Sequence, residues 1–122
     1  MSFTITVRHS AVWVEYLEKV DALDVIHRNK DVTFLEHLTQ TRKVVFDYSK
    51  VKENRISQDD TRGIGVLARL QAEFIPNVHV ILIPNDDESE AKAQYYSTIL
   101  ASTSWRVDIV RHVEEAVKLL TS

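Results

Sequence analysis

Apolar residues either alternate with polar ones or form short continuous runs in five segments of the chain. Phe3, Ile5 and Val7 alternate with polar neighbours, which is typical of a half-buried strand. The next segment alternates in the same way, so the two segments are expected to pair as a hairpin. The two continuous apolar runs are typical of strands covered on both faces. The pattern predicts strands at residues 3–7, 12–17, 43–48, 78–84 and 105–110.

Between the strands, apolar residues recur every three or four positions, which predicts helices. One helix, or two short ones, is expected over residues 21–40, with Asp21 as its N-cap. A later helix is expected at about 89–101, with Ser89 or Asp87 as its cap. A C-terminal helix is expected at 113–120.

The segment from Ser57 onward predicts the longest helix, over residues 58–74. Ser57 is expected to cap it, with Asp60 at the capping-box position. The only two glycines of the chain, Gly63 and Gly65, lie in its first half, where each costs about 1 kcal/mol relative to alanine. Close backbone packing would explain them. The residues expected to face the core are Ile64, Leu67, Ala68 and Phe74.

The elements follow one another in the order ββα-βα-βα-βα. Such alternation favours parallel strands joined by right-handed crossovers, and the N-terminal hairpin makes the sheet mixed. The fold class is therefore α/β with a mixed, mostly parallel sheet. Asp47 is expected near the C-terminal end of a central strand, and residues 49–55 are expected to form a polar, lysine-rich loop.

Composition narrows the function classes. The 122 residues fit one domain spanning 1–122, and the net charge of −3 argues against a protein that binds nucleic acid through its phosphates. The absence of cysteine excludes disulfides, thiolate metal sites and cysteine nucleophiles. No apolar run approaches the ~20 residues that cross a bilayer, and the N-terminus does not resemble a signal peptide. A cytoplasmic protein without membrane insertion is expected.

Three sequence segments, taken together with the order of elements, resemble a known family. The strand that contains Asp47 reads Val-Val-Phe-Asp-Tyr-Ser, and the helix from Asp60 opens with Asp-Thr-Arg-Gly-Ile-Gly. The C-terminal third has Pro-Asn-Asp after a strand, an Ala- and Tyr-containing helix, then Trp-Arg-Val-Asp-Ile-Val and Glu-Glu-Ala-Val-Lys-Leu-Leu. Together they resemble the STAS domain, the fold of bacterial anti-sigma-factor antagonists and of sulfate-transporter cytoplasmic domains. The C-terminal third looks most like stand-alone bacterial proteins of the divergent, antagonist-like branch.

This resemblance implies a non-catalytic regulatory module that binds another protein. The implied partner is a regulatory kinase, an anti-sigma-type protein or a second copy in a homodimer. In the family, the phosphoacceptor is the serine directly before the first glycine; that position here is Arg62, and Thr61 is one residue earlier. Thr61 is therefore the candidate switch. The candidate switch and partner-binding residues are Asp47, Asp60, Thr61, Arg62, Gly63 and Gly65.

Aromatic residues suggest a second contact surface. Tyr95 and Tyr96 are adjacent, so they cannot share one face of a helix. At least one of them is expected at the rim of its helix, against solvent, a ligand or another subunit, because tyrosine is enriched at interfaces.

Candidate catalytic or metal-binding patterns are not found in the sequence. The five histidines lie on different predicted elements without metal-ligand spacing, and His79 is expected to be a hydrogen-bonded core or edge residue. Asp47 resembles the aspartate of phospho-receiver domains, but the acidic pair and the lysine that those domains need are missing. No catalytic residue, metal or cofactor is predicted. The alternative function is a small-ligand or lipid-binding protein of CRAL-TRIO-like character, with a small apolar ligand between the sheet and the helix over 21–40 or 89–101.

Overall fold

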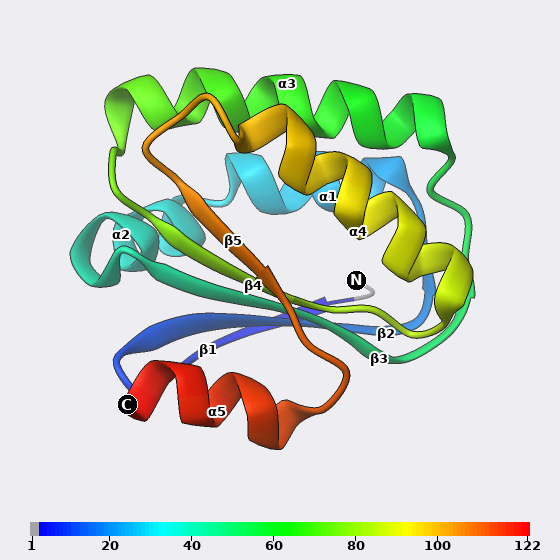
Figure 1. Ribbon diagram of the computed structural model, residues 1–122, viewed down its shortest axis with the longest axis horizontal. Helices are drawn as coiled ribbons and strands as arrows, with labels where there is room; N and C mark the ends of the chain where they lie inside the picture. The colour runs from blue at the N-terminus through cyan, green and yellow to red at the C-terminus, as the bar shows by residue number, and fades with distance from the viewer. Residues whose placement is uncertain (1–2) are drawn as a thin grey trace.

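Five strands form one sheet in the order β1-β2-β3-β4-β5 (Figure 1). The computed structural model describes residues 3–122. Strand β1 is antiparallel to β2, and every other neighbouring pair is parallel. The α/β class and the mixed, mostly parallel sheet are therefore confirmed. The strands are β1 (Phe3–Arg8), β2 (Ala11–Val20), β3 (Lys43–Asn54), β4 (His79–Ile83) and β5 (Arg106–Ile109).

Helices cover both faces of this sheet. Helices α1 to α4 lie on one face and α5 lies alone on the other (Figure 1). The segment over 21–40 forms two short helices, because Asp31 ends α1 and also caps α2. The helices are α1 (Ala22–Lys30), α2 (Val32–Thr41), α3 (Gln58–Phe74), α4 (Asp87–Leu100) and α5 (Val113–Thr121).

Side-chain caps fix where the helices begin. Asp21 caps α1, and Ser57 caps α3 in a capping box with Asp60, as predicted. The predicted cap of α4 was wrong. The helix begins earlier than expected, so Asp86 is its N-cap, and the Asp86 carboxylate accepts the backbone N–H of Ser89 at 2.8 Å.

The expected loop over 49–55 was also wrong, because strand β3 continues to Asn54. Its second half pairs with the second half of β2, and Val51 points inward and is buried. Lys50 and Lys52 face glutamates of β2, with N–O distances of 3.3 Å to Glu15 and 3.6 Å to Glu18. The lysine content that resembled a loop belongs to the exposed side of a strand.

Two apolar cores lie on the two faces of the sheet. The larger lies under α1 to α4, and the smaller lies under α5. Alternate residues of the central strands divide between them, as expected for strands covered on both faces. The larger core includes Phe34, Phe46, Leu82, Tyr96 and Trp105; the smaller includes Trp13, Val45, Ile81, Ala116 and Leu120.

Helix α3 packs through small residues, which corrects its predicted core face. Ile64 and Ala68 do contact the larger core, but Leu67 is 41% exposed and Phe74 is 82% exposed. The buried stripe of α3 consists of Thr61, Gly65, Ala68 and Ala72. Small side chains let α4 approach closely, whereas most of the large apolar side chains of α3 are exposed.

The two glycines of α3 have different surroundings. A Cβ atom on Gly65 would lie 2.8 Å from Cδ1 of Ile99, whereas a Cβ on Gly63 would have no neighbour within 4 Å. The predicted close packing is confirmed at Gly65 and is wrong at Gly63. No helix within residues 3–122 is long and apolar enough to cross a membrane.

Candidate functional site

Three of the predicted site residues have local structural roles. Asp47 lies inside β3 and not near its end, because the strand is longer than predicted. Asp47 is 2% exposed, and its carboxylate accepts the backbone N–H of Ser49 at 2.9 Å. The Asp60 carboxylate accepts the backbone N–H of Ser57 at 3.0 Å. Thr61 is 5% exposed, and its hydroxyl donates to the carbonyl of Ser57 at 2.9 Å.

The other candidates of this segment lie on different sides of α3. Arg62 and Gly63 are exposed, and Gly65 is buried against α4. The structure therefore brings Asp60, Thr61 and Arg62 together in the first turns of the helix but leaves Asp47 on the sheet. Phosphorylation of Thr61 stays a prediction, and a kinase would have to reach a hydroxyl that is buried.

The adjacent tyrosines of α4 divide as predicted. Tyr96 is buried in the larger core, and Tyr95 is half-buried at the rim of the helix.

His79 is held by Asp108 of the neighbouring strand, with Nε2 2.7 Å from the carboxylate oxygen, which confirms its hydrogen-bonded role. Within residues 3–122, no group of three or more His, Asp or Glu side chains is arranged to hold a metal ion.

A small cavity lies between the sheet and helices α1, α3 and α4. Its volume is ≈ 60 Å³. Phe46 and Leu82 contribute its sheet side, and Ile64 contributes an apolar wall from α3. The polar residues that line it are Arg28, Tyr48, Asn54, Thr61, Ser89, Lys92 and Tyr96.

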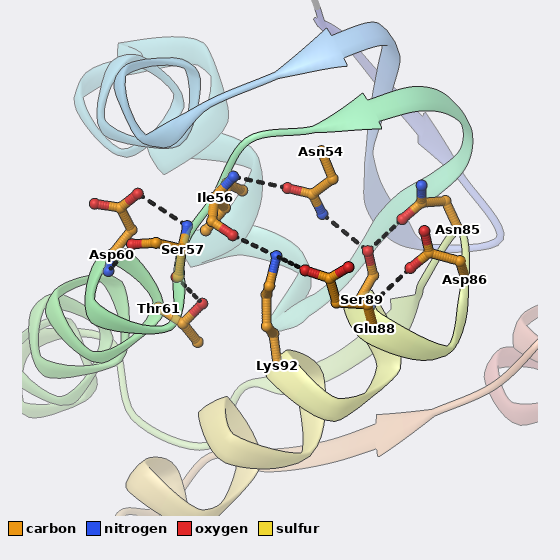
Figure 2. Close-up of polar contacts among 10 residues, drawn as sticks. All are labelled: Asn54, Ile56, Ser57, Asp60, Thr61, Asn85, Asp86, Glu88, Ser89 and Lys92. Carbon is orange, nitrogen blue, oxygen red and sulfur yellow. Dashed lines mark hydrogen bonds and ion pairs between the residues drawn. The ribbon is translucent and has the colours of Figure 1, made fainter.

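A network of side chains joins the ends of three elements beside this cavity (Figure 2). Asn54, at the end of β3, donates to the hydroxyl of Ser89 in α4 at 3.1 Å, and Ser89 donates to Asn85. Figure 2 shows Lys92 reaching from α4 to the carbonyl of Ile56, just before α3 begins. The starts of α3 and α4 are therefore tied to the C-terminal end of β3, where α/β proteins commonly place ligands.

Arg28 is the unusual residue of the cavity. It belongs to α1, is 5% exposed, and its Nε makes no hydrogen bond within residues 3–122. Its guanidinium lies over the rings of Phe46 and Phe34, at 4.1 Å and 5.2 Å from their centres. Stacking on aromatic rings suits a guanidinium, but it leaves the Nε–H of Arg28 without an acceptor among the described residues.

Burial keeps the phenols around Arg28 neutral. It raises the pKa of Tyr96 to about 12 and raises the pKa of Tyr48 well above its ordinary value. The pKa of Tyr16, which stacks on Tyr48 with ring centres 4.7 Å apart, is also raised by burial. The positive charge of Arg28 opposes all three shifts. At neutral pH each phenol therefore remains an O–H donor.

The Tyr96→Phe variant is expected to lose stability less steeply at high pH than the parent. Between pH 10 and 12, Tyr96 ionises in the unfolded chain but remains neutral in the folded protein, so the free energy of unfolding falls as the pH rises. This one group accounts for about 1 kcal/mol between pH 10 and 11. Urea unfolding at pH 9, 10 and 11 would measure the difference, and identical pH profiles would contradict the raised pKa.

A second candidate site lies on the outer side of α3. Four large apolar residues form an exposed stripe along this helix, which we call the α3 stripe. A groove of ≈ 460 Å³ between α3 and the loop after α4 includes Val66 and Leu70. Scattered exposed apolar residues are ordinary, but a contiguous row marks a binding surface. The α3 stripe consists of Val66, Leu67, Leu70 and Phe74, which are 44%, 41%, 53% and 82% exposed.

Neither Arg28 nor the α3 stripe was predicted from the sequence. Arg28 lies three residues after the buried Val25, so its spacing places a charge on the buried side of α1. That spacing was the available signal. The α3 stripe had no such signal in the sequence, because apolar residues at helical spacing are usually assigned to the core.

Comparisons with known proteins identify the fold alone. No protein-family model matches the sequence, and no curated protein matches it. The structure is similar to that of the anti-sigma factor antagonist SpoIIAA in its unphosphorylated form, with a TM-score of 0.60 and 14% sequence identity. The similarity covers 97% of this chain and 96% of that chain. The STAS-like fold predicted from the order of elements is thereby confirmed.

Proposed function

We propose that this STAS-like protein is a non-catalytic regulatory module that acts by binding another protein. The α3 stripe is the observation that carries the proposal, because it exposes four large apolar side chains in one row. Similarity in fold to SpoIIAA, which is named as an anti-sigma factor antagonist, supports a protein as the partner. An anti-sigma-type protein is the class that this similarity favours.

The surroundings of the α3 stripe suggest the chemistry of the partner. Arg62 and Arg69 are exposed on α3 at one side of the stripe, and Glu73 lies near its C-terminal end. Apolar side chains would provide most of the affinity, and the two arginines would select a partner with acidic groups beside its own apolar patch.

The alternative of a lipid carrier is less well supported. Ligand pockets are typically about 300–1,000 Å³, whereas the cavity between the sheet and α1, α3 and α4 has ≈ 60 Å³. The groove of ≈ 460 Å³ is lined in part by the α3 stripe and lies on the outer side of the helices. Its position therefore suits the binding of another protein to this surface.

The Leu70→Ser variant is expected to lose partner binding while remaining folded. Leu70 is 53% exposed, so its replacement should change the free energy of unfolding by no more than about 0.5 kcal/mol. Leu23→Ser is the matched control, because Leu23 is 62% exposed on α1. The parent and both variants would be used to capture proteins from the source cells. A partner is a protein retained by the parent and Leu23→Ser but lost with Leu70→Ser.

The captured partner would then be purified and titrated against all three proteins. Leu70→Ser is expected to weaken the dissociation constant by about 30-fold or more, as for a central interface residue. Equal affinities would contradict a role for the α3 stripe. Light scattering supplies a separate outcome: a parent dimer that Leu70→Ser dissociates would assign the stripe to a second copy of this chain.

A further inference from the structure

Arg28 is a buried cation without a counter-ion among residues 3–122. None of the ion pairs in that range includes it, and its Nε has no hydrogen-bond partner there. A buried charge is unfavourable unless it is paired and hydrogen-bonded. Contact with two aromatic rings compensates the guanidinium only in part, because the rings accept no in-plane hydrogen bond.

A second cation shares the cavity with Arg28. The Lys92 side chain is only 16% exposed, and its ammonium is bonded to the carbonyl of Ile56 and lies 3.7 Å from Glu88. Glu88 is 82% exposed, so this ion pair is largely in solvent and weak. The residues that line the cavity include two cations and no carboxylate. The charged side chains that line it are therefore both positive, although the whole chain has a net charge of −3.

Two neutral phenols, Tyr48 and Tyr96, are further donors on the cavity wall. The hydroxyls of Thr61 and Ser89 also line the cavity, but they donate to Ser57 and Asn85. Apolar walls from Phe46 and Leu82 lower the local dielectric constant, which strengthens each hydrogen bond to a charged ligand. The guanidinium of Arg28, which lines this pocket, has the planar donor set that suits a phosphate or carboxylate group.

The size of the cavity limits the ligand. A buried water needs about 10–15 Å³ on the same measure of volume, so ≈ 60 Å³ holds about four or five non-hydrogen atoms. We propose that this cavity is a binding site for a small oxyanion of the size of phosphate, held by Arg28 and Lys92. The oxyanion is either free phosphate or the phosphoryl group of a small molecule. This site is separate from the α3 stripe. A result that contradicts the proposed function would therefore leave this proposal unaffected, and the reverse also holds.

Titration with phosphate tests the proposal directly. Inorganic phosphate and glycerol 3-phosphate would each be added to the parent protein at constant ionic strength, with chloride as the reference salt. The thermal midpoint is expected to rise with phosphate, because a ligand that binds only the folded state stabilises it. Phosphorus NMR on the same samples reports binding directly. A stronger effect of glycerol 3-phosphate would identify a phosphorylated small molecule as the ligand, and a stronger effect of phosphate would identify the free ion.

Arg28→Met tests whether Arg28 holds the oxyanion. Methionine keeps the apolar length of the side chain and removes the unpaired charge, so the variant is expected to fold and to be at least as stable as the parent without phosphate. Its affinity for phosphate is expected to be at least about tenfold lower, as for the loss of a charged hydrogen-bond donor. Lys92→Met should weaken binding as well. Lys30→Met, at an exposed position of α1, makes the same change in net charge and should leave the affinity unchanged.

Two results would overturn the proposal. One is the absence of phosphate binding to the parent in the NMR titration, which needs no variant. The other is a stabilisation by phosphate that is equal in the parent, Arg28→Met and Lys92→Met, because this would show that the ion acts elsewhere on the surface.

Discussion

Replacing Trp105 with alanine is expected to lower the free energy of unfolding by about 3–5 kcal/mol. Trp105 is 6% exposed in the larger core, and its indole N–H donates to the carbonyl of Ile75 at 2.7 Å. Ile75 is the C-cap of α3, so one side chain joins the start of β5 to the end of the longest helix. The loss would be a large part of a total stability that is typically about 5–15 kcal/mol.

Trp105→Phe separates the two contributions of this side chain. Phenylalanine keeps most of the apolar bulk but leaves the carbonyl of Ile75 without its donor, which should cost about 1–3 kcal/mol. Urea unfolding followed by circular dichroism measures both variants. Phe74→Ala is the control, because a side chain that is 82% exposed should contribute no more than about 0.5 kcal/mol. An equal loss in Trp105→Ala and Phe74→Ala would contradict the assigned core.

Replacing Gly65 with leucine is expected to destabilise the protein by about 3 kcal/mol, the upper part of the range for overpacked cores. Even a Cβ atom at this position would lie 2.8 Å from Cδ1 of Ile99 and 3.2 Å from its Cβ. A larger side chain would therefore collide with the Ile99 side chain, and α3 and α4 would have to repack around it.

Gly63→Leu provides the matched control in the same helix. Apart from the adjacent residues and the backbone of α3, no atom lies within 4 Å of a Cβ at this position. The gain in helix propensity of about 0.5–1 kcal/mol should therefore make the variant more stable than the parent. Shortening Ile99 to alanine should recover part of the stability lost in Gly65→Leu. Changes of the same sign and size at the two glycines would show that α3 and α4 are not closely packed at Gly65.

The sequence predicted most of this fold because the local signals agree with one another. The strand of β4 is a continuous apolar run, and Ser57 with Asp60 forms the capping box that its spacing indicated. Two of the errors, the loop over 49–55 and the core face of α3, have a common physical cause. Lys50 and Lys52 are polar residues on the exposed side of a strand, and Phe74 is an apolar residue that faces solvent. Polarity reports the surroundings of a residue and not its secondary structure.

The candidate site was harder to predict from the sequence, because its residues come from five separate elements. Arg28, Tyr48, Thr61 and Lys92 lie on α1, β3, α3 and α4 and are brought together only by the packing of the helices on the sheet. Their spacing in the sequence contains no motif. The predicted segment from Asp60 to Gly65 contributes two residues, Thr61 and Ile64, to the cavity.

Strand β3 is longer than its neighbour β4, and this difference has a consequence for solubility. Pairing with β4 ends at Asp47, so the backbone from Ser49 to Asn54 has no strand partner on that side within residues 3–122. Asn85 covers part of it by donating to the carbonyl of Val51 at 3.3 Å. Open edges can recruit strands from other molecules and start aggregation, and lysines on an edge oppose this. Lys50 and Lys52 lie in this segment, and their charge would oppose its pairing with a strand of another copy.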